Sequence, residues 1–273
     1  MKDQWRVNGS ESMVSPSDRG LAYGDGLFET MAAQNGRVRW LEHHLRRLSR
    51  DCERLAIPCP ANDLLEAEIN GACPPQGKAV IKLIVTRGNG ARGYRPPADP
   101  KPTRIISVGP WPSYPPSNYT QGIDLRTCET AIAENSVTAG MKHLGRLEQV
   151  LAQIELQESD AQEGLQLCSN GVVVGGTMSN IFAARDGSLS TPKVDSCGVR
   201  GVMRGVVLEY ARRSGIRVNE EVLRARDLRR AEELFVTNSV IGIWPVKRLD
   251  EQEYSVGVHT RKLMSELEVG VRE

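Results

Sequence analysis

Two-residue turn signals between short β-rich runs constrain the fold of this chain more than any other feature. Asn8-Gly9, Asn35-Gly36 and Asp186-Gly187 each have the residue types of a tight hairpin turn, because asparagine, aspartate and glycine accept positive φ angles. Only a few segments, such as 41–55, show apolar residues at helical spacing. Many hairpin-linked strands with few helices favour an α+β fold over a doubly wound parallel sheet.

Composition and charge narrow the classes of partner. The 35 basic residues are balanced by 34 acidic ones and are spread along the chain, so we expect neither nucleic acid nor a membrane as a partner. The sequence has no apolar run of membrane-spanning length and no signal-peptide pattern, which predicts a cytoplasmic protein. It also lacks the P-loop and the G-x-S-x-G elbow, so P-loop nucleotide binding and serine hydrolysis are poor candidates.

The stretch 110–120 is rich in proline and is predicted to link two domains. Four prolines fall within residues 109–118, and this density suits an extended connector. We therefore expect a smaller N-terminal α+β domain over 1–109 and a larger C-terminal domain over 121–273, which would carry Lys142.

Lys142 lies just before a segment in which apolar residues recur at helical spacing. They fall at i, i+3, i+7 and i+10, which predicts a helix with one buried stripe formed by Leu144, Leu147, Leu151 and Ile154. A lysine can form a Schiff base only when its amine is neutral, and this requires burial or nearby positive charge. A solvated lysine is the commoner interpretation of such a position, and the surrounding residues leave both interpretations open.

Three other segments could meet an anion. The expected helix 41–55 carries Arg47 among several basic side chains, although such a face is commonly just solvated. The glycine-rich loop 87–94 carries arginines that could bind an anion or lie in solvent. A further helix is expected to begin after Gly201 and to stop at Gly215, and a helix start attracts anions.

The joint order of the short motifs resembles that of the fold-type IV pyridoxal-phosphate enzymes, which include branched-chain aminotransferases, D-amino acid transaminases and 4-amino-4-deoxychorismate lyases. The resemblance implies their two-domain α+β architecture, pyridoxal 5′-phosphate as cofactor, and a homodimer. The motifs are Asp18-Arg19-Gly20 with Tyr23-Gly24-Asp25-Gly26, His44-Leu45-Arg46-Arg47-Leu48, residues 87–94, Met141-Lys142-His143, Thr177-Met178-Ser179-Asn180-Ile181-Phe182, Gly201-Val202-Met203-Arg204, and Glu233-Leu234-Phe235-Val236-Thr237.

The resemblance also assigns roles to individual residues. Lys142 corresponds to the lysine that forms the internal aldimine with the cofactor and then serves as acid and base, and Arg47 to the arginine that binds the cofactor phosphate. The other positions implied for the cofactor are Asn180, Val202, Met203, Asn238 and Ser239, and those implied for the substrate are Phe28, Arg92 and Tyr94. No metal is implied.

Within the family, residues 140–150 and 87–94 look most like the aminodeoxychorismate lyases, which convert 4-amino-4-deoxychorismate to 4-aminobenzoate and pyruvate for folate synthesis. A transaminase acting on a D-amino acid or a branched-chain amino acid is the alternative. Gly175 is a departure, because the family normally has at this position a glutamate that keeps the pyridine nitrogen of the cofactor protonated. A cofactor-binding relative with weakened activity is therefore a third possibility.

Overall fold

The structure, a computed structural model, describes residues 4–269 and divides the chain into two compact units. The first unit comprises the chain up to Pro112 together with Met141–Gly145, and the second comprises Ser113–Gly140 and the chain from Arg146 onward. Lys142 thus packs with the first unit and not with the C-terminal part in which the sequence predicts it.

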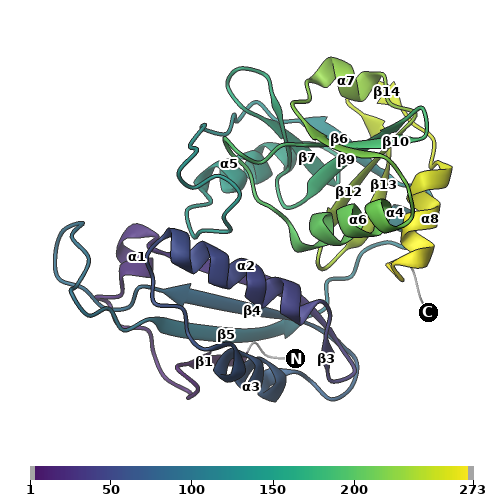
Figure 1. Ribbon diagram of the computed structural model, residues 1–273. Helices are drawn as coiled ribbons and strands as arrows, with labels where there is room; N and C mark the ends of the chain where they lie inside the picture. Colours follow the sequence, from purple (N-terminus) through teal and green to yellow (C-terminus); the bar gives the residue numbers. More distant parts are fainter. Residues whose placement is uncertain (1–3, 270–273) are drawn as a thin grey trace. The chain divides into compact units, whose positions relative to one another are not determined.

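A five-stranded antiparallel sheet forms the centre of the first unit (Figure 1), in the strand order β1-β5-β4-β2-β3. In chain order its elements are β1 (Gln4–Val7), α1 (Arg19–Tyr23), β2 (Gly26–Gln34), β3 (Arg37–Val38), α2 (Leu41–Arg54), α3 (Asn62–Ala72), β4 (Lys78–Thr86) and β5 (Thr103–Pro110).

Alternation along β4 explains how this sheet meets its helices. Every second residue of β4 is buried, and the residues between them, Val80, Lys82 and Ile84, are only partly buried. The pattern arises because successive side chains of a strand point to opposite faces of the sheet. The buried residues are Ala79, Ile81, Leu83 and Val85. The buried set shares one core with side chains from α2 and α3, including Leu48. The helix predicted at 41–55 and the turn predicted at Asn35-Gly36 are confirmed.

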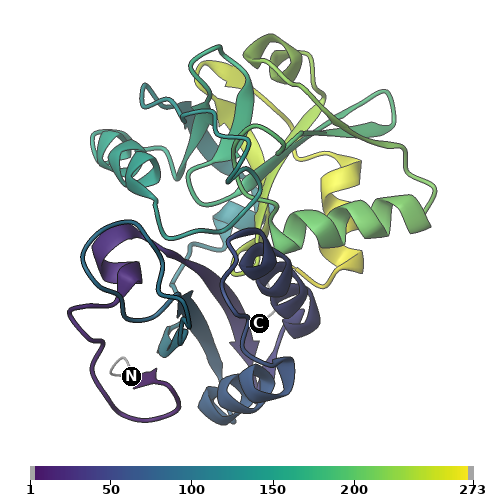
Figure 2. The ribbon, with the colours of Figure 1, turned by 60° about the vertical axis from the view of Figure 1, so that its left-hand side comes forward.

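The second unit contains a nine-stranded mixed sheet, with the order β11-β10-β9-β12-β13-β6-β7-β8 and with β14 paired to β13. Figure 2 shows α6 and α8 beside this sheet, and both helices pack on β12 or β13. The elements are α4 (Ser117–Thr120), β6 (Ile123–Thr127), α5 (Leu147–Leu156), β7 (Glu163–Leu167), β8 (Val173–Gly176), β9 (Asn180–Arg185), β10 (Ser188–Pro192), α6 (Val202–Arg213), β11 (Val218–Glu221), α7 (Ala225–Arg229), β12 (Glu233–Asn238), β13 (Gly242–Leu249), β14 (Gln252–Glu253) and α8 (Val258–Glu266).

A long crossover between β6 and β7 contains the lysine. These two strands pair in parallel, and parallel neighbours require a connection that returns to the same end of the sheet. The crossover passes through Met141–Gly145 of the first unit and then forms α5. The α+β class is confirmed by the two sheets and their flanking helices.

The buried stripe predicted for the helix after Lys142 is wrong. The helix exists as α5, but Leu147 is 77% exposed and Leu151 and Ile154 are each 53% exposed. The helix buries Ala152 and Leu156 instead. Apolar spacing identified the helix, but it could not show whether the larger apolar face meets the core of the same chain.

Strand β13 is difficult to predict from the sequence. Pro245 lies inside β13, and proline is rare within strands because it lacks an N–H donor. In the structure Pro245 is opposite Phe235 of β12, while pairing on the other side of β13 begins at Val246 with Ile123. The pairing of β13 with β6 therefore begins one residue after the proline.

No helix within residues 4–269 combines the length and the apolar character that crossing a membrane would need.

Candidate active site

Backbone hydrogen bonds hold Lys142 against the start of β2. The Phe28 N–H donates to the Lys142 carbonyl at 2.9 Å, and the Leu144 N–H donates to the Gly26 carbonyl at 3.0 Å. On the other side, the Lys142 N–H donates to Asp51 Oδ2 of α2 at 3.3 Å. The lysine is thus fixed through its backbone to a strand and to a helix of the first unit.

The side chains of Lys142 and Phe28, both predicted as site residues, meet in the structure. Lys142 Nζ lies 4.1 Å from the centroid of the Phe28 ring, and Lys82 Nζ lies 5.2 Å from the same centroid. An aromatic face attracts an amine that carries positive charge. Phe28 therefore positions the Lys142 amine, and Lys82 is a second amine at the same ring.

Glu29 is the next residue of β2, and its buried carboxylate binds two side chains of α2. The carboxylate is 1% exposed. Arg47 donates from Nε to Oε1 at 2.8 Å and from Nη2 to Oε2 at 2.5 Å, which is a bidentate pair. His44 Nδ1 lies 2.5 Å from Oε2. Arg47, which the sequence assigns to the cofactor phosphate, is thus oriented by Glu29.

The charges of this triad can be assigned from burial and contacts. Burial alone would raise the pKa of Glu29, but Arg47 and His44 outweigh it and lower that pKa to about 2. Burial lowers the pKa of His44 in spite of Glu29, so we assign a neutral imidazole that donates Nδ1–H to the carboxylate. Arg47 is then the cation that balances Glu29. The His44 Nε2 atom is buried and has no hydrogen-bond partner among the described residues.

Arg92 and Tyr94, the predicted substrate residues, lie on a loop that a different contact network of the first unit holds in place. Both side chains are exposed, Tyr94 by 85%. Arg19 holds their loop through the backbone, donating to the Gly93 carbonyl at 3.1 Å and to the Tyr94 carbonyl at 3.0 Å. The Gly93 N–H donates to the Tyr23 hydroxyl at 3.0 Å.

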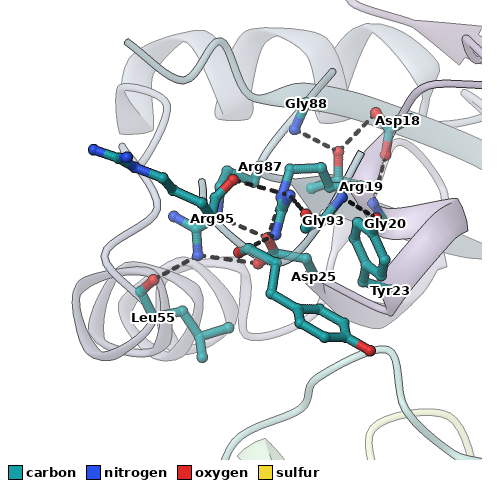
Figure 3. Close-up of polar contacts among 12 residues, drawn as sticks. Asp18, Arg19, Gly20, Tyr23, Asp25, Leu55, Arg87, Gly88, Gly93 and Arg95 are labelled. Atoms are coloured by element: carbon teal, nitrogen blue, oxygen red, sulfur yellow. Dashed lines mark hydrogen bonds and ion pairs between the residues drawn. The ribbon is translucent and has the colours of Figure 1, made fainter. Parts of the chain in front are cut away.

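Asp25 joins this loop to the end of α2 (Figure 3). It accepts from Arg19 Nε at 2.8 Å and from Arg87 Nε at 2.7 Å. Arg87 also donates to the carbonyls of Leu55 and Ala56. Burial acts to raise the pKa of Asp25, but the two arginines lower it below its usual value, so it is ionised at neutral pH. The Asp18-Arg19-Gly20 motif therefore orders the 87–95 loop.

The start of α6 is the candidate phosphate site of the second unit. Gly201 is the N-cap, and no side-chain hydrogen bond caps the helix, so the amides of Val202 and Met203 lie in an uncapped first turn. A Cβ atom at Gly201 would lie 2.1 Å from Asn180 Oδ1. Asn180 in turn donates from Nδ2 to the Val199 carbonyl at 2.9 Å. Three predicted cofactor residues, Asn180, Val202 and Met203, are thus brought together.

Thr237 is a residue of this site that the sequence prediction omits. It lies opposite Asn180 in the β9–β12 ladder, so the two side chains share one face of the sheet. Its hydroxyl is fully buried and, within residues 4–269, finds no hydrogen-bond partner. A buried hydroxyl without a partner is costly, which marks a place for a polar ligand group.

Asn238 and Ser239, the residues of the predicted cofactor turn, directly follow Thr237. Asn238 Oδ1 accepts from the N–H groups of Val240 and Ile241 at 2.8 and 2.9 Å, and Nδ2 donates to the Met178 carbonyl at 3.2 Å. The Asn238 amide therefore shapes the turn, and Ser239 is half-buried in it.

Gly175 occupies a backbone conformation that excludes a simple return to glutamate. Its φ of +153° is strained for a side-chain-bearing residue, and a Cβ atom would lie 2.9 Å from the Ser179 carbonyl oxygen. At the adjacent Gly176, a Cβ atom would lie 2.1 Å from Ser179 Oγ and 2.8 Å from Glu163 Oε2. Both glycines allow β8 to approach the 177–180 loop closely.

Glu163 is the buried carboxylate next to this loop, and both of its oxygens already accept hydrogen bonds from the protein. They accept from the N–H of Gly164 at 2.9 Å, from the Thr177 N–H at 3.1 Å and from Ser179 Oγ at 2.8 Å, and the Thr177 hydroxyl and the Met178 N–H also donate. Burial raises the pKa of Glu163. Glu163 supports the loop that leads to Asn180 and is not a replacement for a carboxylate at position 175.

Several of these residues escaped the sequence prediction for one reason. Glu29 and Glu163 are defined by burial and by partners that are not their sequence neighbours, and Thr237 is defined by burial alone; residue spacing reports neither. Glu29 had a usable signal, because a charged residue in a mostly apolar strand, between Phe28 and Thr30, needs a partner.

A sequence model of the family "Amino-transferase class IV" matches residues 26–249, and the chain belongs to this family of fold-type IV pyridoxal-phosphate enzymes. The resemblance noted from the motifs is therefore confirmed. Members of the family bind pyridoxal 5′-phosphate.

Three relatives show where the chain lies within the family. The solved 4-amino-4-deoxychorismate lyase from Pseudomonas aeruginosa is 46% identical, with a TM-score of 0.93, and the match covers 97% of this chain and 98% of that one. The aminodeoxychorismate lyase of Vibrio harveyi is 32% identical over 266 residues, or 96% of this chain and 98% of that protein. A putative branched-chain-amino-acid aminotransferase of Methanocaldococcus jannaschii is 33% identical over 263 residues, or 94% and 91%.

The residues of the second unit fit a phosphate group but not a protonated pyridine nitrogen. The uncapped amides of α6, the unpartnered Thr237 hydroxyl and the close approach at Gly201 suit a phosphate. Position 175 offers no carboxylate to a ring nitrogen, and Glu163 is occupied by its own loop.

We predict that Glu29→Gln lowers the free energy of unfolding by about 3 kcal/mol at pH 7, since a pKa lowered from 4.5 to about 2 corresponds to that amount. The folded-state pKa is depressed, so the contribution is fully present above pH 4.5 and is lost as the pH falls toward 2. Denaturant unfolding from pH 7 to pH 3 should therefore show the two proteins converging. Glu42→Gln serves as the control, because Glu42 forms an exposed ion pair on α2, the helix that carries Arg47. It should change the free energy of unfolding by less than about 0.5 kcal/mol. An undiminished gap at pH 3 would contradict the assignment.

Proposed function

We propose that this protein is a pyridoxal-phosphate-dependent lyase that converts 4-amino-4-deoxychorismate to 4-aminobenzoate and pyruvate, a step of folate biosynthesis. The observation that carries the proposal is the 46% identity to the P. aeruginosa lyase over nearly the full length of both chains. The V. harveyi lyase supports the same choice at nearly full coverage.

Pyridoxal 5′-phosphate, when bound, supplies an electron sink and a carbon that binds amines. In the proposed reaction Lys142 would hold the cofactor before substrate binds, and its freed amine would accept the ring hydrogen of the substrate and return a proton at the enolpyruvyl methylene. Phe28 keeps the amine on the face of its ring. By the family resemblance Arg47, which Glu29 orients, would donate to phosphate oxygens, and the free N–H groups in the first turn of α6 would do the same.

A coupled assay tests the proposed activity. Purified protein loaded with pyridoxal 5′-phosphate should release pyruvate and 4-aminobenzoate in equal amounts from 4-amino-4-deoxychorismate, and Lys142→Ala should lose at least about a hundredfold in rate, as expected for loss of a general acid–base group. Release of neither product by the loaded wild-type protein would overturn the proposal.

A transaminase is the second candidate, because the M. jannaschii relative is as similar in sequence as the V. harveyi lyase. The two activities differ in one observable. A transaminase converts its cofactor to the amine form in the presence of a D-amino acid or a branched-chain amino acid, and a 2-oxo acid restores the aldehyde form. The lyase does neither as part of its cycle.

A third candidate is a relative that binds the cofactor with weakened turnover, and Gly175 supports it. Without a carboxylate at the ring nitrogen the cofactor withdraws electrons less strongly. The φ of +153° at Gly175 means that Gly175→Glu would strain β8, so restoring the glutamate alone is not a neutral test of this idea.

We predict that Gly201→Ala weakens binding of pyridoxal 5′-phosphate about tenfold, the equivalent of one lost hydrogen bond. The added methyl group would displace Asn180 from the start of α6. Gly205→Ala is the matched control, because it lies on the same helix and its Cβ atom would meet nothing within 4 Å. Absorbance titration of both variants measures the dissociation constants. Equal affinities would contradict a phosphate site at this helix start.

We further propose a homodimer, in line with the family resemblance, and the exposed stripe of α5 supports it. Leu147, Val150, Leu151 and Ile154 are each more than half exposed, and such a patch on a helix is typical of an interface. Sedimentation velocity should show a dimer, and Leu151→Ser should shift it toward monomer. Leu64→Ser, at an exposed leucine of α3, should not. A monomeric wild-type protein would contradict the proposal.

A further inference from the structure

Two cysteines of the second unit bring their sulfur atoms into direct contact. The sulfur atoms of Cys168 and Cys197 lie 2.8 Å apart, and both side chains are buried. They form one small cluster with the buried side chains of Ile132 and Val174. A disulfide bond joins sulfur atoms about 2.05 Å apart, so the two sulfurs have to approach each other by less than about 1 Å to form one.

The two cysteines come from segments that are distant in the sequence. Cys168 directly follows β7, and Cys197 lies in the connection between β10 and α6. The Cys168 N–H donates to the Val172 carbonyl at 2.8 Å, and the Cys168 carbonyl accepts from the Gly171 N–H at 2.9 Å. These two hydrogen bonds close a tight turn, which holds the backbone of Cys168 beside the connection that carries Cys197.

Backbone contacts also hold the segment that follows Cys197. The Gly140 N–H donates to the Gly198 carbonyl at 2.9 Å. The Val199 carbonyl accepts from Asn180 Nδ2 at 2.9 Å, and the next element of the chain is α6. The segment therefore leads from the cysteine pair directly to the candidate phosphate site.

Both thiols lie next to residues at the surface. Ser169, directly after Cys168, is exposed, and so is Asp195, two residues before Cys197. A small oxidant such as hydrogen peroxide reaches such a pair through local opening of the chain. Burial raises the pKa of Cys168, so we expect slower oxidation than at an exposed thiol such as Cys59.

We propose that Cys168 and Cys197 are an oxidation site, at which hydrogen peroxide creates a disulfide that ties the segment before α6 to the end of β7. One sulfur, as the thiolate, attacks a peroxide oxygen; the O–O bond breaks, hydroxide leaves and a sulfenic acid forms. The second thiol loses its proton, and its sulfur attacks the sulfenic sulfur and releases the oxygen as water. The two thiols lose two electrons and two protons in total, and hydrogen peroxide is reduced to two water molecules.

The disulfide closes a long loop and leaves the neighbouring backbone in place. The two cysteines are 29 positions apart, and a disulfide across such a loop stabilises a protein mainly by restricting the unfolded chain. Because the sulfur atoms are already in contact, the hydrogen bonds at Gly198 and Val199 can persist after oxidation. The oxidised protein should therefore be harder to unfold and should keep its cofactor phosphate site. The second of these expectations rests on the proposed function.

The experiment treats the full-length protein with hydrogen peroxide, blocks the remaining thiols and maps tryptic peptides by mass spectrometry. Cleavage after Arg185 and Lys193 places the two cysteines in different peptides, so the disulfide appears as a linked pair that a reductant separates. Oxidation should raise the melting temperature of the wild-type protein by about 5–10 °C.

Matched variants assign that rise to the cysteine pair. Cys168→Ala and Cys197→Ala should each show no rise on oxidation, and each variant is compared with its own reduced form, so a change in its basal stability does not affect the result. Cys128→Ala, at another buried thiol of the second unit, should behave as the wild-type protein does.

A separate measurement addresses the cofactor site. Absorbance titration of oxidised and reduced wild-type protein should give dissociation constants for pyridoxal 5′-phosphate within about twofold of each other, because the segment before α6 is not displaced. Peptide mapping and the melting temperature require no cofactor, so they test the disulfide independently of the proposed function.

Three results would overturn the proposal. The first is the absence of the linked peptide under conditions that fully oxidise the exposed Cys59. The second is an equal rise in melting temperature in Cys168→Ala. The third is a loss of cofactor affinity of about tenfold or more when the wild-type protein is oxidised.

Discussion

The buried carboxylate of Glu29 is the interaction on which the first unit depends. A single negative charge in the core has to be balanced, and Arg47 supplies the balance while His44 donates a hydrogen bond. Both partners lie on α2, so the pairing fixes this helix on β2. The preceding residue, Phe28, points to the other side of the strand and receives the Lys142 amine. Two consecutive residues of β2 thus orient the predicted cofactor arginine and the predicted cofactor lysine.

The second unit uses a buried carboxylate in a comparable way. Glu163 accepts hydrogen bonds from residues 177–179, which lead to Asn180 beside the start of α6. Glycines at 175 and 176 allow the close approach that these hydrogen bonds require. Gly175 also stands at the position where the family resemblance implies a carboxylate for the ring nitrogen. The loop is thus held by hydrogen bonds to Glu163, without a carboxylate at position 175.

Elements that depend on a local sequence pattern are predictable from the sequence. The turn at Asn35-Gly36 and helix α2 follow from turn chemistry and apolar spacing, and the structure confirms both. The predictions fail where contacts between residues far apart in the sequence determine the structure. Leu151 has the spacing of a core residue yet is exposed. Strand β13 lies inside the sheet although it contains Pro245, and its pairing with β6 begins one residue after this proline. Within the candidate site, motif order indicated Lys142, Arg47 and the start of α6, whereas the unpartnered Thr237 became visible only through burial and register.

Covalent attachment of the cofactor to Lys142 is the most direct test of this account. Incubation with pyridoxal 5′-phosphate should produce a visible absorption band that borohydride removes, and peptide mapping should then find the label on Lys142. Lys82 is the informative competitor, because its amine approaches the same Phe28 ring. A label confined to Lys142, with no band in Lys142→Ala, is the predicted result. A colourless wild-type protein, or a label on Lys82 in place of Lys142, would contradict the assignment.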